Sequence, residues 1–101
     1  MYKQFTEAVI EIIKSIPAGK VQTYGGISKL AGHLNGARQV VRILSSMSEK
    51  HDLPWHRVIN SKGELPHLND QMFAEQKALL IKEKVKVSPE GKVNLKEYLW
   101  N

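Results

Sequence analysis

Residues 23–44 read TYGGISKLAGHLNGARQVVRIL, and this stretch decides the fold. Thr23 can begin a short helix over 24–31, because a threonine side chain accepts a hydrogen bond from a backbone N–H of the first turn. Residues 32–36 are turn formers, and over about 37–47 the apolar side chains recur on one helical face. Two short helices joined by a tight turn predict a helix-turn-helix.

On the N-terminal side of this stretch, residues 2–16 predict an amphipathic helix. Pro17 and Gly19 end it. Its apolar side chains are spaced three and four apart and so share one face: Phe5, Val9, Ile12, Ile13 and Ile16.

On the C-terminal side, residues 50–68 are rich in Pro, Gly, Asn, Ser and His, which predicts a loop with one extended stretch at 57–59. Asn69 or Asp70 can cap a further helix that runs to about Glu83. A loop of this length in a small domain is usually functional.

Residues 84–95 alternate valine with polar residues around a turn at 88–91, which predicts a β-hairpin and a wing. The expected fold is therefore mainly α with a small β-hairpin, a winged helix-turn-helix, in a single domain over residues 1–101.

The composition is that of a small globular protein, and its excess of basic residues favours an acidic partner. The 101 residues suit one core, and 42% are hydrophobic and 25% charged. No apolar run approaches the roughly 20 residues that span a bilayer, so we expect a cytoplasmic protein without membrane contact. The net charge of +5 favours nucleic acid, although a solvated lysine face gives the same balance. The chain has no cysteine, which excludes disulfides, thiolate metal sites and cysteine nucleophiles.

The segment Pro54-Trp55-His56-Arg57-Val58 follows two others, residues 16–25 (IPAGKVQTYG) and residues 37–41 (ARQVV). Together, in this order, they resemble the DNA-binding domain of the O6-alkylguanine-DNA alkyltransferases over about residues 5–83. In that family the corresponding segment reads Pro-Cys-His-Arg-Val, and its cysteine accepts the alkyl group from a flipped-out guanine. With tryptophan at this position, the chain resembles the alkyltransferase-like proteins, which lack the thiol.

The chemistry of Trp55 agrees with that resemblance. An alkyl acceptor needs a thiolate or a comparable nucleophile, and the indole N–H is a donor without a free lone pair. Outside this motif Trp55 would be interpreted as a core aromatic. Within it, we expect Trp55 and Val58 to form a wall of a base pocket, and we expect no enzymatic activity.

The resemblance also implies how DNA is held. Arg38 corresponds to an arginine finger that fills the space left by the extruded nucleotide, where the guanidinium can both stack and donate hydrogen bonds. Tyr24 corresponds to a tyrosine beside the flipped nucleotide, in a minor-groove complex. The alternatives without a DNA-binding role are an ordinary solvated arginine for Arg38 and a half-buried aromatic at a helix start for Tyr24. Phosphate contacts are predicted for four basic residues that would otherwise be ordinary solvated side chains: Lys20, Lys29, Arg42 and Lys62.

His56 and Glu83 resemble the pair that assists thiol deprotonation in the enzymes. Without a thiol, we expect them to be a structural remnant that ties the loop to the last helix, with Arg57 also structural.

One segment departs from the family. Where the enzymes have a glycine-rich stretch that closes on the base, this chain has Leu65-Pro66-His67-Leu68-Asn69-Asp70. We hypothesise a roomier pocket here. An apolar adduct would gain about 0.8 kcal/mol per buried methylene in a dry pocket.

The resemblance implies a monomeric, nucleoid-associated sensor of O6-alkylguanine in double-stranded DNA. It would need no cofactor or metal and would pass lesions to nucleotide excision repair. Two alternatives remain: a winged helix-turn-helix transcriptional regulator of undamaged DNA, and a glycosylase that uses His56 and Glu83.

Overall fold

The computed structural model describes residues 2–101, and side chains from residue 4 onward. The helices are α1 (Tyr2–Ser15), α2 (Tyr24–Leu30), α3 (Ala37–His51), α4 (Asp70–Lys82) and α5 (Leu95–Tyr98). A 3₁₀ turn, η1 (Trp55–Arg57), precedes β2 (Val58–Ile59), which pairs with β1 (Gln22–Thr23). None of the helices in the described part of the chain has both the length and the apolar character needed to cross a bilayer.

The helix-turn-helix prediction is confirmed by α2, the turn after it and α3. Thr23 caps α2 as expected, because its side chain accepts a hydrogen bond from the Gly26 N–H. The turn is closed by Ser28, which is fully buried. Its hydroxyl donates to the His33 carbonyl and accepts from the Gly36 N–H, the latter at 2.9 Å.

Helix α3 is longer than the sequence predicted. It continues through Lys50 and His51, where the composition predicts a loop, and Asp52 caps its C-terminus in the left-handed conformation, with φ 51°. The added turn is closed by a hydrogen bond from the Leu53 N–H to the Ser48 carbonyl at 2.9 Å, and Leu53 itself is buried in the core.

The small sheet is parallel and joins two segments far apart in sequence. Gln22 lies opposite Val58, and Thr23 lies opposite Ile59. Because the strands are parallel, α2 starts at the end of the sheet where β2 ends, and η1 lies at the other end, where β1 begins.

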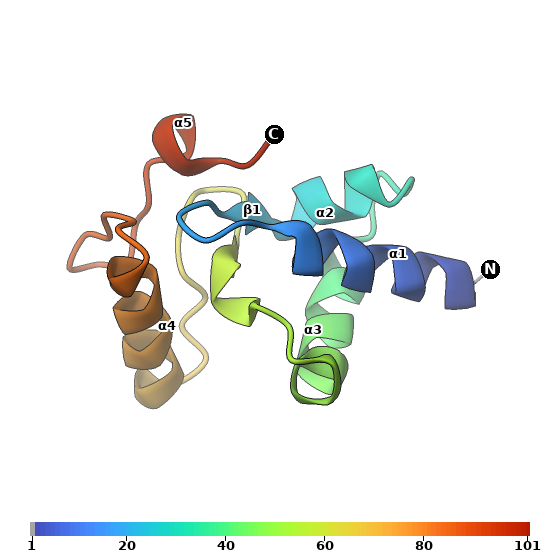
Figure 1. The fold of residues 1–101 in the computed structure, drawn as a ribbon, viewed down its shortest axis with the longest axis horizontal. Coiled ribbons are helices and arrows are strands. Elements are labelled where there is room, and N and C mark those ends of the chain that lie inside the picture. Colours follow the sequence, from blue (N-terminus) through green and yellow to red (C-terminus); the bar gives the residue numbers. More distant parts are fainter. Residues whose placement is uncertain (1) are drawn as a thin grey trace.

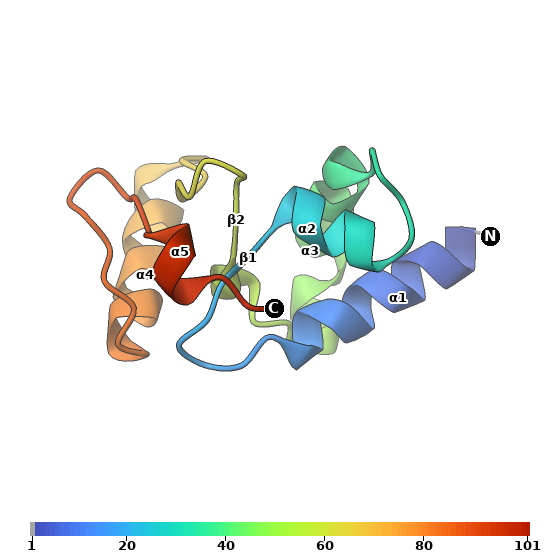
Figure 2. The ribbon, with the colours of Figure 1, turned by 90° about the horizontal axis from the view of Figure 1, so that it is seen from above.

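Two groups of buried side chains flank the strands. One joins α1, α2 and α3 around Val9, Ile13, Ile27 and Val40. Figures 1 and 2 show α4 and α5 on the other side of the strands from α1, α2 and α3, and the second group forms around these two helices and Ile59 of β2. Its buried side chains are Val21, Ile59, Leu65, Leu80, Val85, Val93 and Tyr98.

The predicted hairpin over 84–95 is wrong. Its turn exists, since the Gly91 N–H donates to the Ser88 carbonyl at 2.9 Å, but the two flanking arms form no strand pair in the described chain. The second arm pairs instead with residues 63–65, because the Val93 N–H donates to Gly63 and the Leu65 N–H donates to Gly91. Val85 and Val93 both point into the core, which the alternating pattern alone does not distinguish from a hairpin face.

The rest of the C-terminal half is close to the expectation. Asn69 caps α4 by accepting from the Met72 N–H at 2.8 Å, and α4 ends at Lys82, next to the predicted end at Glu83. The extended stretch predicted at 57–59 is the strand Val58–Ile59. Helix α5 was not expected.

Candidate functional site

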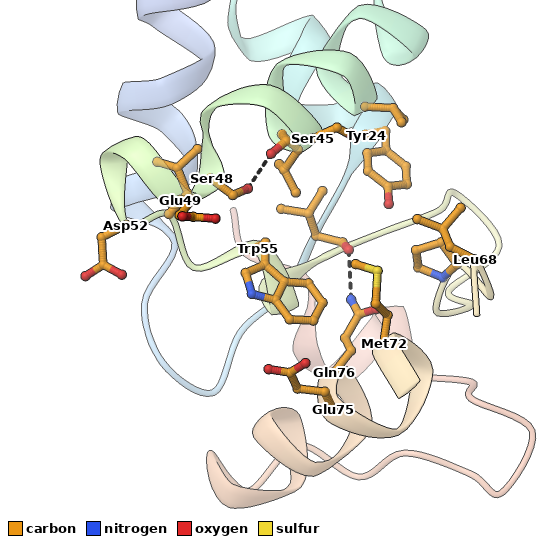
Figure 3. A pocket seen from close by; sticks show the side chains of 15 residues that line it. Tyr24, Ser45, Ser48, Glu49, Asp52, Trp55, Leu68, Met72, Glu75 and Gln76 are labelled. Carbon is orange, nitrogen blue, oxygen red and sulfur yellow. Dashed lines mark hydrogen bonds between the residues drawn. The ribbon is translucent and has the colours of Figure 1, made fainter. Parts of the chain in front are cut away.

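A cavity of about 480 Å³ opens between α3, η1 and the start of α4. Figure 3 shows its side chains converging from these elements and from the loop before α4. Its lining consists of Tyr24, Val41, Leu44, Ser45, Ser48, Glu49, Asp52, Leu53, Trp55, Val58, Pro66, Leu68, Met72, Glu75 and Gln76.

Trp55 and Val58 both line this cavity. Trp55 opens the 3₁₀ turn, which is closed by a hydrogen bond from the Arg57 N–H to the Pro54 carbonyl at 3.0 Å. The indole is only partly buried, whereas Val58 is 1% exposed. Trp55 therefore forms part of the cavity surface rather than the interior of a core.

Tyr24 enters the cavity from the first residue of α2. Burial raises the pKa of its phenol above the ordinary value of 10.0. The side chain is therefore a neutral hydroxyl at physiological pH, and it can both donate and accept a hydrogen bond.

Behind the cavity wall, Glu83 binds two side chains of the Trp55 segment. His56 Nε2 lies 2.8 Å from Glu83 Oε2, and Arg57 donates to the same carboxylate from Nη2 at 2.6 Å and from Nε at 3.0 Å. Arg57 Nη1 also donates to the carbonyl of Ile16 at 2.8 Å, and the Gly19 N–H donates to Glu83 at 3.3 Å. The three sequence-predicted residues thus lie together and join the ends of α1, η1 and α4.

The electrostatics of Glu83 reflect these partners. Burial by itself raises its pKa, but hydrogen bonds from Arg57, His56 and Gly19 outweigh burial and lower the pKa from 4.5 to about 2. The carboxylate is therefore charged at neutral pH and is occupied by cationic and polar donors. It has no free acid function to offer to a substrate.

Gln76 is a site residue that the sequence did not reveal. It is 2% exposed, lines the cavity from α4, and donates from Nε2 to the carbonyls of His56 and Val58, both at 3.1 Å. It thereby fixes the backbone on both sides of Arg57. A glutamine in a helix of mixed polarity carries no sequence signal for this role.

The predicted DNA-contacting cations lie outside the cavity lining. Arg38 in the first turn of α3, Arg42 one turn later and Lys29 in the last turn of α2 are all exposed. Lys20 differs, because its ammonium donates to the Glu97 carbonyl at 3.3 Å. Lys20 is therefore placed beside the C-terminal segment, apart from the helix-turn-helix.

Three acidic residues of the lining were also missed: Glu49 and Asp52 at the end of α3, and Glu75 on α4. Glu75 is more than twenty residues from the other two in sequence, and only the packing of α3 and η1 against α4 places all three at one cavity.

Comparison with known proteins agrees with this architecture. The family described as 6-O-methylguanine DNA methyltransferase, DNA binding domain, matches residues 4–85. A protein of Escherichia coli (strain K12) named DNA base-flipping protein is 41% identical over 97 residues, which cover 96% of this chain and 74% of the relative. Alkyltransferase-like protein 1 of Schizosaccharomyces pombe is 36% identical over 102 residues, covering 96% and 94% of the two chains.

Solved structures show the same likeness. S. pombe Atl1 in complex with damaged DNA containing O6-carboxymethylguanine matches with a TM-score of 0.89 and 36% identity, over 100% of this chain and 97% of that one. The Mycobacterium tuberculosis O6-methylguanine methyltransferase matches with a TM-score of 0.63 and 26% identity, over 91% of this chain and 53% of that one.

Proposed function

This chain belongs to the family of the 6-O-methylguanine DNA methyltransferase DNA-binding domain, together with alkyltransferase-like and DNA base-flipping relatives, and we propose that it binds O6-alkylguanine in duplex DNA without removing the alkyl group. One observation carries the proposal. Trp55 occupies the wall of a cavity at the motif position where the resemblance implies an alkyl-accepting cysteine, and the chain contains no cysteine.

Binding would begin at the exposed cations of the helix-turn-helix. Arg42 and Lys29 neutralise phosphates, and the small residues Gly36 and Ala37 let α3 sit deep in the minor groove. That groove is poor in sequence information, which suits a scanner for lesions in any sequence.

Extrusion of the guanine costs a few kcal/mol, and less when O6-alkylation has removed the proton used in base pairing. In the proposed complex Arg38 enters the duplex and occupies the space of the extruded nucleotide. Tyr24 stands beside the nucleotide, and the cavity at Trp55 and Val58 retains the base. The cavity volume of about 480 Å³ leaves room for an adduct in addition to a guanine.

Because no alkyl acceptor is available, the complex would persist until another protein takes over the lesion. We propose a monomer that presents the distorted DNA to nucleotide excision repair and acts in the cytoplasm at the nucleoid. His56, Arg57 and Glu83 would keep a structural role, since all of their polar contacts described above hold segments of the chain together.

The test is a titration of a duplex with one O6-methylguanine and of its unmodified twin. The proposal expects at least tenfold tighter binding of the methylated duplex, with no change in protein mass and an intact methylated base afterwards. Equal affinities, combined with preference for one DNA sequence, would instead indicate a transcriptional regulator. A mass gain of one methyl group would indicate a transferase, and an abasic site would indicate a glycosylase.

A further inference from the structure

The cavity is asymmetric in charge. Of the 15 described side chains that line it, three are carboxylates and none is lysine or arginine. This asymmetry is unexpected in a chain with a net charge of +5 and only 10 acidic residues. From it we infer, on the basis of the proposed function, that the cavity selects adducts by charge: it favours O6-alkyl groups that end in a cation and disfavours anionic ones.

Two of the carboxylates, Glu49 and Asp52, lie at the end of α3, and the third, Glu75, lies on α4. Val41 and Glu49 lie about 12 Å apart along the axis of α3, so the helix leads from an apolar end to an acidic one. In Figure 3, Tyr24 and Leu68 lie on one side of Trp55, Glu49 and Asp52 lie on the other, and Glu75 lies on α4 below the indole.

The position of Trp55 indicates which part of a bound nucleotide would meet these carboxylates. An alkyl acceptor must touch the alkyl carbon, so in the proposed complex the O6 substituent points toward residue 55, while the rest of the nucleotide lies beside Tyr24. A substituent longer than methyl would then extend past Trp55 toward Glu49, Asp52 and Glu75.

These three carboxylates take no part in the salt bridges that the structure describes. Glu49, Asp52 and Glu75 are all exposed. Neighbouring neutral groups add acceptors. The Ser48 hydroxyl donates to the Leu44 carbonyl, and the hydrogen bonds of the Gln76 amide use only Nε2, which leaves oxygen lone pairs at both residues.

The expected size of the charge effect on affinity follows from the solvent exposure of the three carboxylates. Charges in contact with solvent are screened, so we expect about a threefold to tenfold effect per unit of adduct charge. The discrimination would be visible as a ratio of dissociation constants and would weaken as salt is raised.

The experiment compares duplexes carrying O6-(3-aminopropyl)guanine, O6-butylguanine, O6-carboxymethylguanine and O6-methylguanine with the unmodified duplex. The amine should bind at least threefold more tightly than butyl, and carboxymethyl at least threefold more weakly than methyl. In Glu49→Gln/Glu75→Gln these differences should shrink toward one. The matched control Glu7→Gln/Glu11→Gln removes two exposed charges from α1 and should leave the ratios unchanged.

The outcomes distinguish a failure of the charge selection from a failure of the proposed function. Tight binding of O6-methylguanine with no charge ordering, or with an ordering that survives Glu49→Gln/Glu75→Gln, overturns the charge selection alone. Equal affinity for O6-methylguanine and guanine overturns the proposed function and the charge selection with it.

Discussion

Arg57 binds Glu83 through a forked contact, with Nη2 2.6 Å from Oε2 and Nε 3.0 Å from Oε1. The two side chains are 18% and 16% exposed, so the pair is mostly removed from solvent. Arg57 also donates from Nη1 to the carbonyl of Ile16, the residue that directly follows α1. One arginine thus determines how the Trp55 segment sits against the rest of the chain.

We expect Arg57→Lys to lower the free energy of unfolding by about 1–3 kcal/mol, because an ammonium cannot reproduce two parallel hydrogen bonds and a third to a carbonyl. Urea unfolding followed by circular dichroism measures this. Arg42→Lys, on the exposed face of α3, is the matched control and should change stability by less than about 0.5 kcal/mol. Equal effects of the two substitutions would contradict the structural role of Arg57.

Stability should fall in acid because of Glu83. Its pKa is lowered from 4.5 to about 2 in the folded chain, so its contribution is fully present above pH 4.5 and is lost as pH falls toward 2. A shift of this size corresponds to at most about 3 kcal/mol. Glu83→Gln should therefore be less stable at pH 7 and should show a flatter decline between pH 5 and 2. Glu7→Gln, an exposed carboxylate on α1, should retain the wild-type slope.

The turn of the helix-turn-helix depends on Ser28 and Gly36. Ser28→Ala should cost about 1–3 kcal/mol, because it leaves the Gly36 N–H and the His33 carbonyl without their buried partner. Gly36→Ala should also destabilise, since the added Cβ would lie 2.5 Å from Ser28 Oγ and 3.0 Å from Phe5 Cζ.

The two substitutions should not be additive, because Ser28→Ala removes one of the atoms that the new Cβ meets. Gly25→Ala is the control. A Cβ there meets nothing within 4 Å, and alanine favours the helix by about 0.5–1 kcal/mol. Thermal unfolding of Ser28→Ala, Gly36→Ala, the double variant and Gly25→Ala measures these changes in stability. Strict additivity of the two single effects in the double variant would exclude a shared contact.

Arg38 and Lys29 should contribute differently to DNA binding. Arg38→Ala should reduce the preference for O6-methylguanine over guanine, because the finger acts only when the nucleotide is extruded. Lys29→Ala should weaken binding of both duplexes equally. It should also reduce the slope of log K against log salt concentration by about one, the value expected for one lost phosphate contact. Fluorescence anisotropy at several salt concentrations measures both quantities. If the two variants lose preference to the same degree, Arg38 is an ordinary phosphate contact.

Trp55→Ala should selectively weaken lesion binding. An aromatic side chain that packs on a base contributes about 1–3 kcal/mol, which is roughly a fivefold to hundredfold loss of affinity. The unmodified duplex should bind as before, because it does not fill the cavity. Trp100→Phe serves as a control for tryptophan content, since Trp100 packs against the core. Loss of affinity for both duplexes in Trp55→Ala would indicate a general rather than a pocket role.

The sequence alone determined the local elements that have short-range causes. The spacing of Val9, Ile13 and Ile16 predicted α1, and Thr23 and Asn69 predicted the starts of α2 and α4, because periodicity and capping act within one or two turns. The ordered motifs around Tyr24, Arg38 and Trp55 predicted the family. The prediction for residues 84–95 was wrong because alternating valines are equally compatible with a hairpin and with an extended arm that pairs elsewhere.

Only the tertiary structure decided what surrounds Trp55. The parallel pairing of β1 with β2, the Gln76 hydrogen bonds to the η1 segment and the meeting of Glu49 and Asp52 with Glu75 at one cavity all join residues that are far apart in the sequence. Such contacts depend on how helix faces pack, and packing is set by the combined shape and burial of many side chains. The missing thiol is therefore readable in the sequence, whereas the character of the cavity that replaces it comes from the fold.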